Sequence, residues 1–201
     1  MTAAPKRHSS AFTLIELLVV IGIIAVVAGL VVGLGAVAGE KSKISRAQAE
    51  RDRLVTLIEN YKAKIGVYPP DHRQNAGRNT LLYELAGAVR NPPPNDPNYV
   101  TPFGTIRSNL LWSAFEAGGI INASDDGTDI KRLMKELKPD QTNEVAAGAI
   151  SLVVPIDGPN GRPNPWKYLT GTNAVHNPET FDLWVDIKVR GQTRTIGNWK
   201  D

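Results

Sequence analysis

The chain has 201 residues, of which 42% are hydrophobic and 21% charged, a composition typical of one modest folded domain with an appendage. Its formal charge is +3, but subtracting Lys6 and Arg7, which precede the first apolar run, from the 23 basic residues leaves 21 against 20 acidic ones, and this balance does not favour nucleic-acid binding. The absence of cysteine excludes disulfides and thiolate metal sites.

The first predicted element is an apolar helix. The run from Leu17 to Gly39 holds 23 consecutive uncharged residues. At about 1.5 Å per residue it would span roughly 35 Å, which is long enough to cross a bilayer. Glu16 stands immediately before it. An ionisable group in that position is costly and suggests a functional site with a partner.

Three interpretations of this segment compete. An ordinary transmembrane anchor fits the length but leaves Glu16 unexplained. A secretory signal peptide would use Lys6 and Arg7 as its basic start and residues 36–38 as its cleavage site, but its apolar region is usually only about 7 to 15 residues long. The third interpretation rests on the string AFTLIELLVVIGIIA, which begins at Ala11.

This string closely resembles the N-terminal segment of type IV pilins and of the pseudopilins of type II secretion. The resemblance implies a leader of residues 1–11 that prepilin peptidase cuts between Ala11 and Phe12, followed by methylation of the Phe12 amine. The residue before the cut is usually glycine in the family, whereas this chain has Ala11. Glu16 then takes the position of the family's glutamate, where it would neutralise the Phe12 amine of a neighbouring subunit.

The helix is expected to continue past the membrane. Apolar residues recur at three- and four-residue steps, and Gly66 with the Pro69-Pro70 pair ends the pattern; the stripe consists of Ile44, Ala47, Leu54, Leu57 or Ile58, Tyr61 and Ile65. We therefore predict a transmembrane and filament-core helix at residues 12–39 and an amphipathic continuation at residues 40–65.

Glycines in the membrane half give two small-xxx-small spacings, which favour close helix packing in a filament. They are Gly29, Gly33, Gly35 and Gly39. The alternative is that glycine is simply common in membrane helices.

Basic residues are more numerous after the apolar run than before it, at Lys41, Lys43, Arg46, Arg51 and Arg53. The positive-inside rule alone would therefore place the large domain in the cytoplasm. The resemblance implies the opposite orientation, and we follow it because the family's leader is cut on the cytoplasmic side.

Residues 66–201 are predicted to form a turn-rich globular head, since thirteen of the 14 prolines lie at or after Pro69. The pattern predicts short helices at residues 79–89, 108–119 (capped by Ser108 and stopped by Gly118) and 128–137, a loop at 91–104, and strands at 150–156, 166–171 and 180–189. The predicted fold class is thus α+β: a long N-terminal helix and a head with short helices and a small antiparallel sheet within residues 150–201. The resemblance implies the same pilin-like lollipop.

Further strings are similar to the major pseudopilin of type II secretion. They are LIENYKAKIGVYPPD, VPIDGPNGRPNPWKYL, TFDLW and the terminal IGNW. Residues 75–144 show no resemblance and are interpreted as an insertion.

Major pseudopilins bind calcium between the last strand and the tail, and calcium takes six to eight oxygen ligands. The corresponding stretch here has Asp186 as its only acid, close to three basic residues, with Asp182 and Asp201 nearby. No cofactor is therefore predicted, and Asp182, Asp186 and Asp201 are only weak calcium candidates.

We expect a non-catalytic structural subunit of a type II secretion pseudopilus or type IV pilus-like filament. The implied partners are copies of itself, other pilin-like subunits, prepilin peptidase, the inner-membrane assembly platform and the membrane, without nucleic acid. The chain would cross the inner membrane once, with its head in the periplasm, before joining an envelope filament. The alternative is a monomeric, membrane-tethered extracytoplasmic binding module with residues 75–144 as its ligand surface.

Overall fold

The computed structural model describes residues 13–72, 74–91, 98–146 and 148–199, the side chains of residues 30–38 excepted. The chain divides into two units, residues 1–42 and 43–201. Helix α1 (Leu14–Ile65) contributes residues to both.

The end of α1 lies where the sequence predicts it. Gly66 follows the helix with φ of +95°, a left-handed conformation that glycine adopts at little cost, and its N–H donates to the Lys62 carbonyl at 2.9 Å. The prediction that the helix runs to Ile65 is confirmed.

In the unit of residues 43–201, the predicted apolar stripe of α1 faces the core. Ala47, Leu54, Ile58 and Tyr61 are each at most 3% exposed. Glu50 is buried on the same stripe, and its Oε1 accepts a hydrogen bond from Gln141 Nε2 at 3.0 Å. The apolar pattern did not reveal this carboxylate, because its partner is far away in the sequence.

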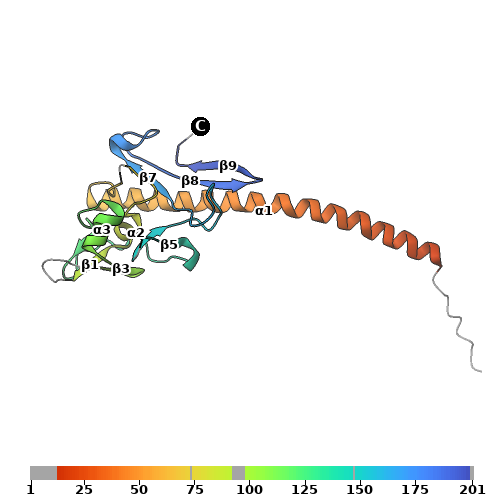
Figure 1. Ribbon diagram of the computed structural model, residues 1–201, viewed down its shortest axis with the longest axis horizontal. Helices are drawn as coiled ribbons and strands as arrows, with labels where there is room; N and C mark the ends of the chain where they lie inside the picture. The colour runs from red at the N-terminus through yellow and green to blue at the C-terminus, as the bar shows by residue number, and fades with distance from the viewer. Residues whose placement is uncertain (1–12, 73, 92–97, 147, 200–201) are drawn as a thin grey trace, which may run out of the picture. The chain divides into compact units, whose positions relative to one another are not determined.

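Three small sheets build much of this unit in the described part of the chain (Figure 1). The antiparallel sheet β7-β8-β9 joins β7 (Lys167–Thr170), β8 (Phe181–Val189) and β9 (Gln192–Gly197). An antiparallel pair joins β5 (Thr142–Ala146) and β6 (Ala149–Leu152).

The third sheet has the order β3-β2-β1-β4 and comprises β1 (Ala88–Asn91), β2 (Asn98–Thr101), β3 (Gly104–Arg107) and β4 (Ala123–Ser124). Its β1–β4 pair is parallel. The predicted α+β class, the strands at β7 and β8 and an antiparallel sheet within residues 150–201 are confirmed, whereas the other two sheets lie outside that prediction.

Two of the predicted short helices exist, with corrected ends. Helix α2 (Leu81–Ala86) stops at Gly87, and the next residues enter β1. Helix α3 (Ser108–Phe115) has Arg107 rather than Ser108 at the capping position. It ends at Phe115, and Glu116, whose φ is +53°, caps it before the predicted stop at Gly118. Two short 3-10 turns complete the elements, η1 (Pro139–Gln141) and η2 (Gly171–Asn173).

The predicted helix at residues 128–137 is wrong, because distant acceptors take its backbone N–H groups. The N–H of Lys131 donates to Asn122 Oδ1 at 2.8 Å, and the N–H groups of Leu133 and Met134 both donate to the Leu85 carbonyl. Tertiary hydrogen bonds therefore override local helix propensity here. The predicted loop at 91–104 is also partly wrong, since it contains β2.

Residues 75–144, which the sequence analysis interprets as an insertion, contribute to the hydrophobic core of the head. All six residues of α2 are buried, and four of them pack in one hydrophobic core with residues of α1, β7 and β8: Leu81, Leu82, Tyr83 and Leu85. Trp166, Tyr61 and Tyr168 are among the largest fully buried side chains of that core. This segment is therefore an integral layer of the head.

Glu84 connects three segments that are distant in the sequence. Its Oε2 accepts from the Tyr61 hydroxyl at 2.7 Å and from the Asn122 N–H at 3.0 Å, while its Oε1 accepts from the Ile121 N–H at 2.9 Å. Burial raises the pKa of Glu84, and these three donors oppose that shift. The carboxylate thus ties α1 and α2 to the segment before β4.

We expect Glu84→Gln to lower the free energy of unfolding by about 2 kcal/mol, because in either orientation the amide nitrogen would face a backbone N–H. Urea unfolding measures the change. The matched control is Glu179→Gln, since Glu179 is exposed; it should shift stability by less than about 0.5 kcal/mol. Equal small effects at both positions would contradict the assigned role of Glu84.

Candidate functional site

The predicted assembly residue Glu16 lies in the first turn of α1 and is hydrogen-bonded to Thr13. Both the N–H and the hydroxyl of Thr13 donate to Glu16 Oε2, at 2.9 and 2.7 Å, and the Glu16 N–H donates to Thr13 Oγ1 at 3.4 Å. This reciprocal pattern is a capping box. The sequence interpretation missed it, although TLIE at residues 13–16 carries its signature.

The capping box gives Glu16 a local reason for its position. Its carboxylate satisfies an N–H that has no partner within the helix, and a negative charge is favourable at a helix N-terminus. Its second oxygen, Oε1, makes no hydrogen bond among the described residues. Ala11 and Phe12, the predicted processing residues, lie outside the described residues.

The N-terminal part of α1 presents an apolar surface. Each large apolar side chain from Leu14 to Val27 is between 46% and 81% exposed. A continuous apolar surface of this kind marks an interaction site with a membrane or a protein. Among the described residues, no helix combines the length and the apolarity needed to cross a membrane. The predicted span at residues 12–39 is therefore not confirmed.

Two of the glycines predicted to pack against other helices, Gly29 and Gly39, have open space around them within the described chain. A Cβ placed on Gly29 or Gly39 would have no heavy atom within 4 Å. Gly33 and Gly35 lie among the residues whose side-chain surroundings are not described. No contact within the described chain therefore requires glycine at position 29 or 39.

The weak calcium candidates are engaged in other interactions. Both oxygens of Asp182, which is 1% exposed, accept N–H groups: Oδ2 from Val175 and His176 at 2.7 and 2.8 Å, and Oδ1 from the backbone and side chain of Asn177, each at 2.9 Å. Asp186 accepts from Lys167 Nζ and Thr195 Oγ1, each at 2.6 Å. Asp201 lies outside the described residues.

This donor set does not fit calcium. N–H hydrogens point at both oxygens of Asp182, where a cation would need lone pairs, and calcium requires several more oxygens. In the described part of the chain, no three His, Cys, Asp or Glu residues gather in a metal-binding arrangement. The stretch that the resemblance treats as a loop forms strand β9, with Thr195 opposite Asp186.

Hydrogen bonds and ring stacking hold the C-terminal tail on β8. Asn198 Oδ1 accepts from the Leu183 N–H, and Asn198 Nδ2 donates to the Phe181 carbonyl, each at 2.9 Å. The rings of His176 and Trp199 stack with centroids 3.9 Å apart. Together with Asp182, these contacts form what we call the tail clasp (Asn177, Asp182, Asn198, His176 and Trp199).

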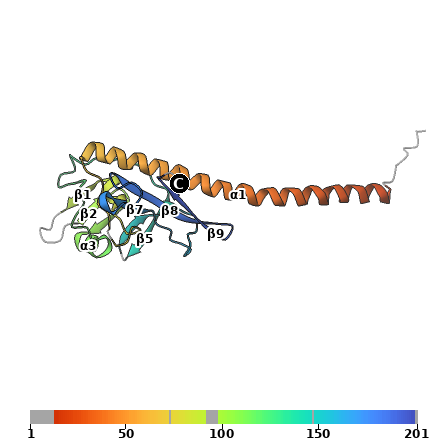
Figure 2. The same cartoon turned by 90° about the horizontal axis from the view of Figure 1, so that it is seen from above.

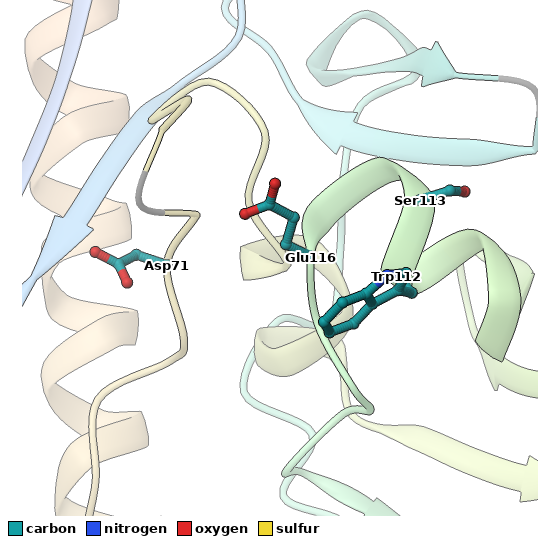
Figure 3. A pocket seen from close by; sticks show the side chains of 4 residues that line it. All are labelled: Asp71, Trp112, Ser113 and Glu116. Carbon is teal, nitrogen blue, oxygen red and sulfur yellow. The ribbon is translucent and has the colours of Figure 1, made fainter.

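A cavity of about 570 Å³ lies between the α1–α2 connection and α3 (Figure 3), lined by Asp71, Trp112, Ser113 and Glu116. Asp71 accepts hydrogen bonds from Thr170 N–H and Asn173 Nδ2, and Figure 3 shows Ser113 directed away from Asp71. Trp112 is 64% exposed. These four residues form no nucleophile–base pair of the kind that covalent catalysis uses.

One comparison identifies the N-terminal segment. A family model described as the prokaryotic N-terminal methylation motif matches residues 6–32. No curated protein and no solved structure matches the chain. The match supports a type IV pilin-like prepilin and indicates membrane anchoring through the N-terminus, whereas the major pseudopilin specifically is not confirmed.

We expect Asp182→Asn to lower the free energy of unfolding by about 2 kcal/mol, because either orientation of the amide would place its nitrogen against an N–H donor. Adding calcium or a chelator to the unaltered protein should leave its thermal unfolding midpoint unchanged. Circular dichroism measures both. Asp129→Asn, at an exposed position, is the matched control, and a midpoint that rises with calcium would refute the clasp as we describe it.

Proposed function

We propose that the chain is a structural, non-catalytic subunit of a pilin-like filament, processed between Ala11 and Phe12 and assembled through its N-terminal helix. The supporting observation is that the methylation-motif match at residues 6–32 coincides with the part of α1 from Leu14 to Val27, where every large apolar side chain is exposed. That surface requires a nonaqueous environment: lipid before assembly and other subunits afterwards.

In this proposal Glu16 has two functions. Its Oε2 caps α1 through Thr13, while Oε1 makes no hydrogen bond among the described residues and is available to a cationic partner. The methylated amine of Phe12 in a neighbouring subunit supplies that charge. Because a buried charge is costly without its partner, the pair favours one axial register between subunits.

Among pilin-like filaments we favour the type II secretion pseudopilus. The strings at residues 57–71 and 154–169 support this choice, because they resemble the major pseudopilin. The tail clasp departs from the calcium site of that protein, so the finer assignment rests on the sequence strings alone. The proposed partners are copies of this chain, other pilin-like subunits, prepilin peptidase and the inner-membrane assembly platform, with the head in the periplasm.

The first test concerns processing. Protein purified from its native host should begin at Phe12 and carry a methylated amine, because the motif places the cut after Ala11. Intact-mass analysis with N-terminal peptide sequencing measures this directly. A retained Met1, or a start at Gly39 as signal peptidase would produce, would show that the segment is not a prepilin leader.

The second test separates the two functions of Glu16. Glu16→Gln removes the charge but keeps a residue type that closes a capping box, whereas Thr13→Ala removes the cap and keeps the charge. We expect Glu16→Gln and Glu16→Ala to abolish filaments, since an unpaired buried charge costs about 3 to 5 kcal/mol. Thr13→Ala should assemble with a modest loss, because a cap contributes about 1 kcal/mol.

Sheared fibres from cells that co-express the secretion machinery, counted by electron microscopy, provide the measurement. Immunoblots of membrane fractions control for insertion and processing. Normal fibre yield from Glu16→Gln, together with loss of fibres from Thr13→Ala, would mean that Glu16 acts as a helix cap and not as a charge partner.

A further inference from the structure

The β8–β9 hairpin carries basic side chains at its turn. Lys188 and Arg194 lie on its two strands, and Arg190 begins the turn. The register pairs Ile187 with Arg194 and Lys188 with Thr193, so these cations lie within a few residues of one another. All three are exposed.

The turn of this hairpin lies toward the end of the head where α1 enters it. Arg51 Nη1 on α1 donates to the Gly197 carbonyl at 2.8 Å, and Gln48 lines a cavity together with Thr193 and Arg194. Strand β9 therefore runs alongside α1. Its first residues, next to the hairpin turn, lie nearer to Lys43, the first residue of this unit, than its last residues do. Figures 1 and 2 both show the β8–β9 hairpin lying along the part of α1 in this unit, with its turn directed toward the N-terminal end of that part.

Lys43, Lys188 and Arg194 form no ion pair with the carboxylates described around them. Three neighbouring carboxylates are already paired: Asp186 with Lys167 at 2.6 Å, Asp140 with Arg46 at 2.8 Å, and Asp157 with Arg162 at 2.7 Å. We call Lys43, Lys188, Arg190 and Arg194 the basic collar.

We propose that the basic collar binds the anionic phospholipid headgroups of the membrane that holds the N-terminal segment. This inference rests on the proposed membrane anchoring. Lys43 closely follows the apolar run that ends at Gly39, so the chain itself brings the collar to the membrane surface. Each cation near an anionic lipid surface increases the binding affinity roughly fivefold. The excess of basic residues after the apolar run then reflects lipid docking and not membrane orientation.

The test uses the full chain in lipid nanodiscs. Because the chain has no cysteine, Gln192→Cys gives a single attachment site for a fluorophore beside the hairpin turn. Glu179→Cys, just before the opposite end of β8, is the control position. We expect acrylamide quenching at position 192 to fall about threefold or more when phosphatidylglycerol replaces half of the phosphatidylcholine, and to recover at about 0.5 M salt, where screening is strong. Quenching at position 179 should stay constant.

A charge-matched pair of variants makes the result specific. The lipid dependence should disappear in the triple variant Lys43→Gln, Lys188→Gln and Arg194→Gln. It should persist in a control triple variant with the same change in net charge, Lys64→Gln, Arg132→Gln and Lys135→Gln. Quenching at position 192 that does not depend on lipid in nanodisc-bound protein would overturn the collar alone. A chain that does not co-elute with nanodiscs would overturn the proposed anchoring, and the collar with it. Equal protection of position 192 by DNA without lipid would assign the surface to nucleic acid and overturn the proposal.

Discussion

A buried carboxylate organises the head. Glu84 has no exposed surface, and a buried carboxylate is costly unless hydrogen-bond donors satisfy it. Its donors are the Tyr61 hydroxyl on α1 and the backbone N–H groups of Ile121 and Asn122. Asn122 then uses its own side chain to accept from the Lys131 N–H. One interaction therefore fixes where α2 docks on the long helix and why the following chain stays extended. A segment without recognisable sequence similarity is nevertheless part of the core.

Helix α1 presents two different surfaces along its length. Its described apolar residues before position 30 are exposed, whereas Ala47, Leu54 and Ile58 pack inside the head. The tail clasp fastens the other end of the chain on β8 with backbone donors and the Asn198 side chain. The head thus holds its own C-terminal tail by hydrogen bonds, while the described apolar side chains of α1 before position 30 remain exposed.

The sequence predicts best what depends on neighbouring residues. The end of α1 at Ile65 and the strands β7 and β8 follow from periodicity and from glycine, all of which are local signals. The sequence does not predict strand β9, because only Ile196 among its residues is buried and the strand therefore lacks the alternation of a half-buried strand.

The remaining errors have a different physical origin. The helix expected at 128–137 fails because its N–H groups bond to Leu85 and Asn122, and Glu50 and Glu84 are buried against partners that no local pattern reveals. The capping box at Thr13 and Glu16 is the opposite case, since its signature is visible in the sequence. At that position the sequence carries a local explanation for Glu16 in addition to the one that the family resemblance implies.

The burial of Glu50 links proton uptake to the docking of α1. Burial raises the pKa of Glu50, and the nearby Trp166 and Gln141 donors offset this only in part; in the described chain Glu50 Oε2 and Trp166 Nε1 lack a hydrogen bond of good geometry. Because the folded-state pKa lies above the ordinary value of 4.5, the folded head holds this proton more tightly than the unfolded chain. The resulting stabilisation is complete below that value and is lost as pH rises through the folded pKa. Protonation of Glu50 therefore contributes stability to the folded state in which α1 is docked on the head, and the proton acts as a ligand of that state.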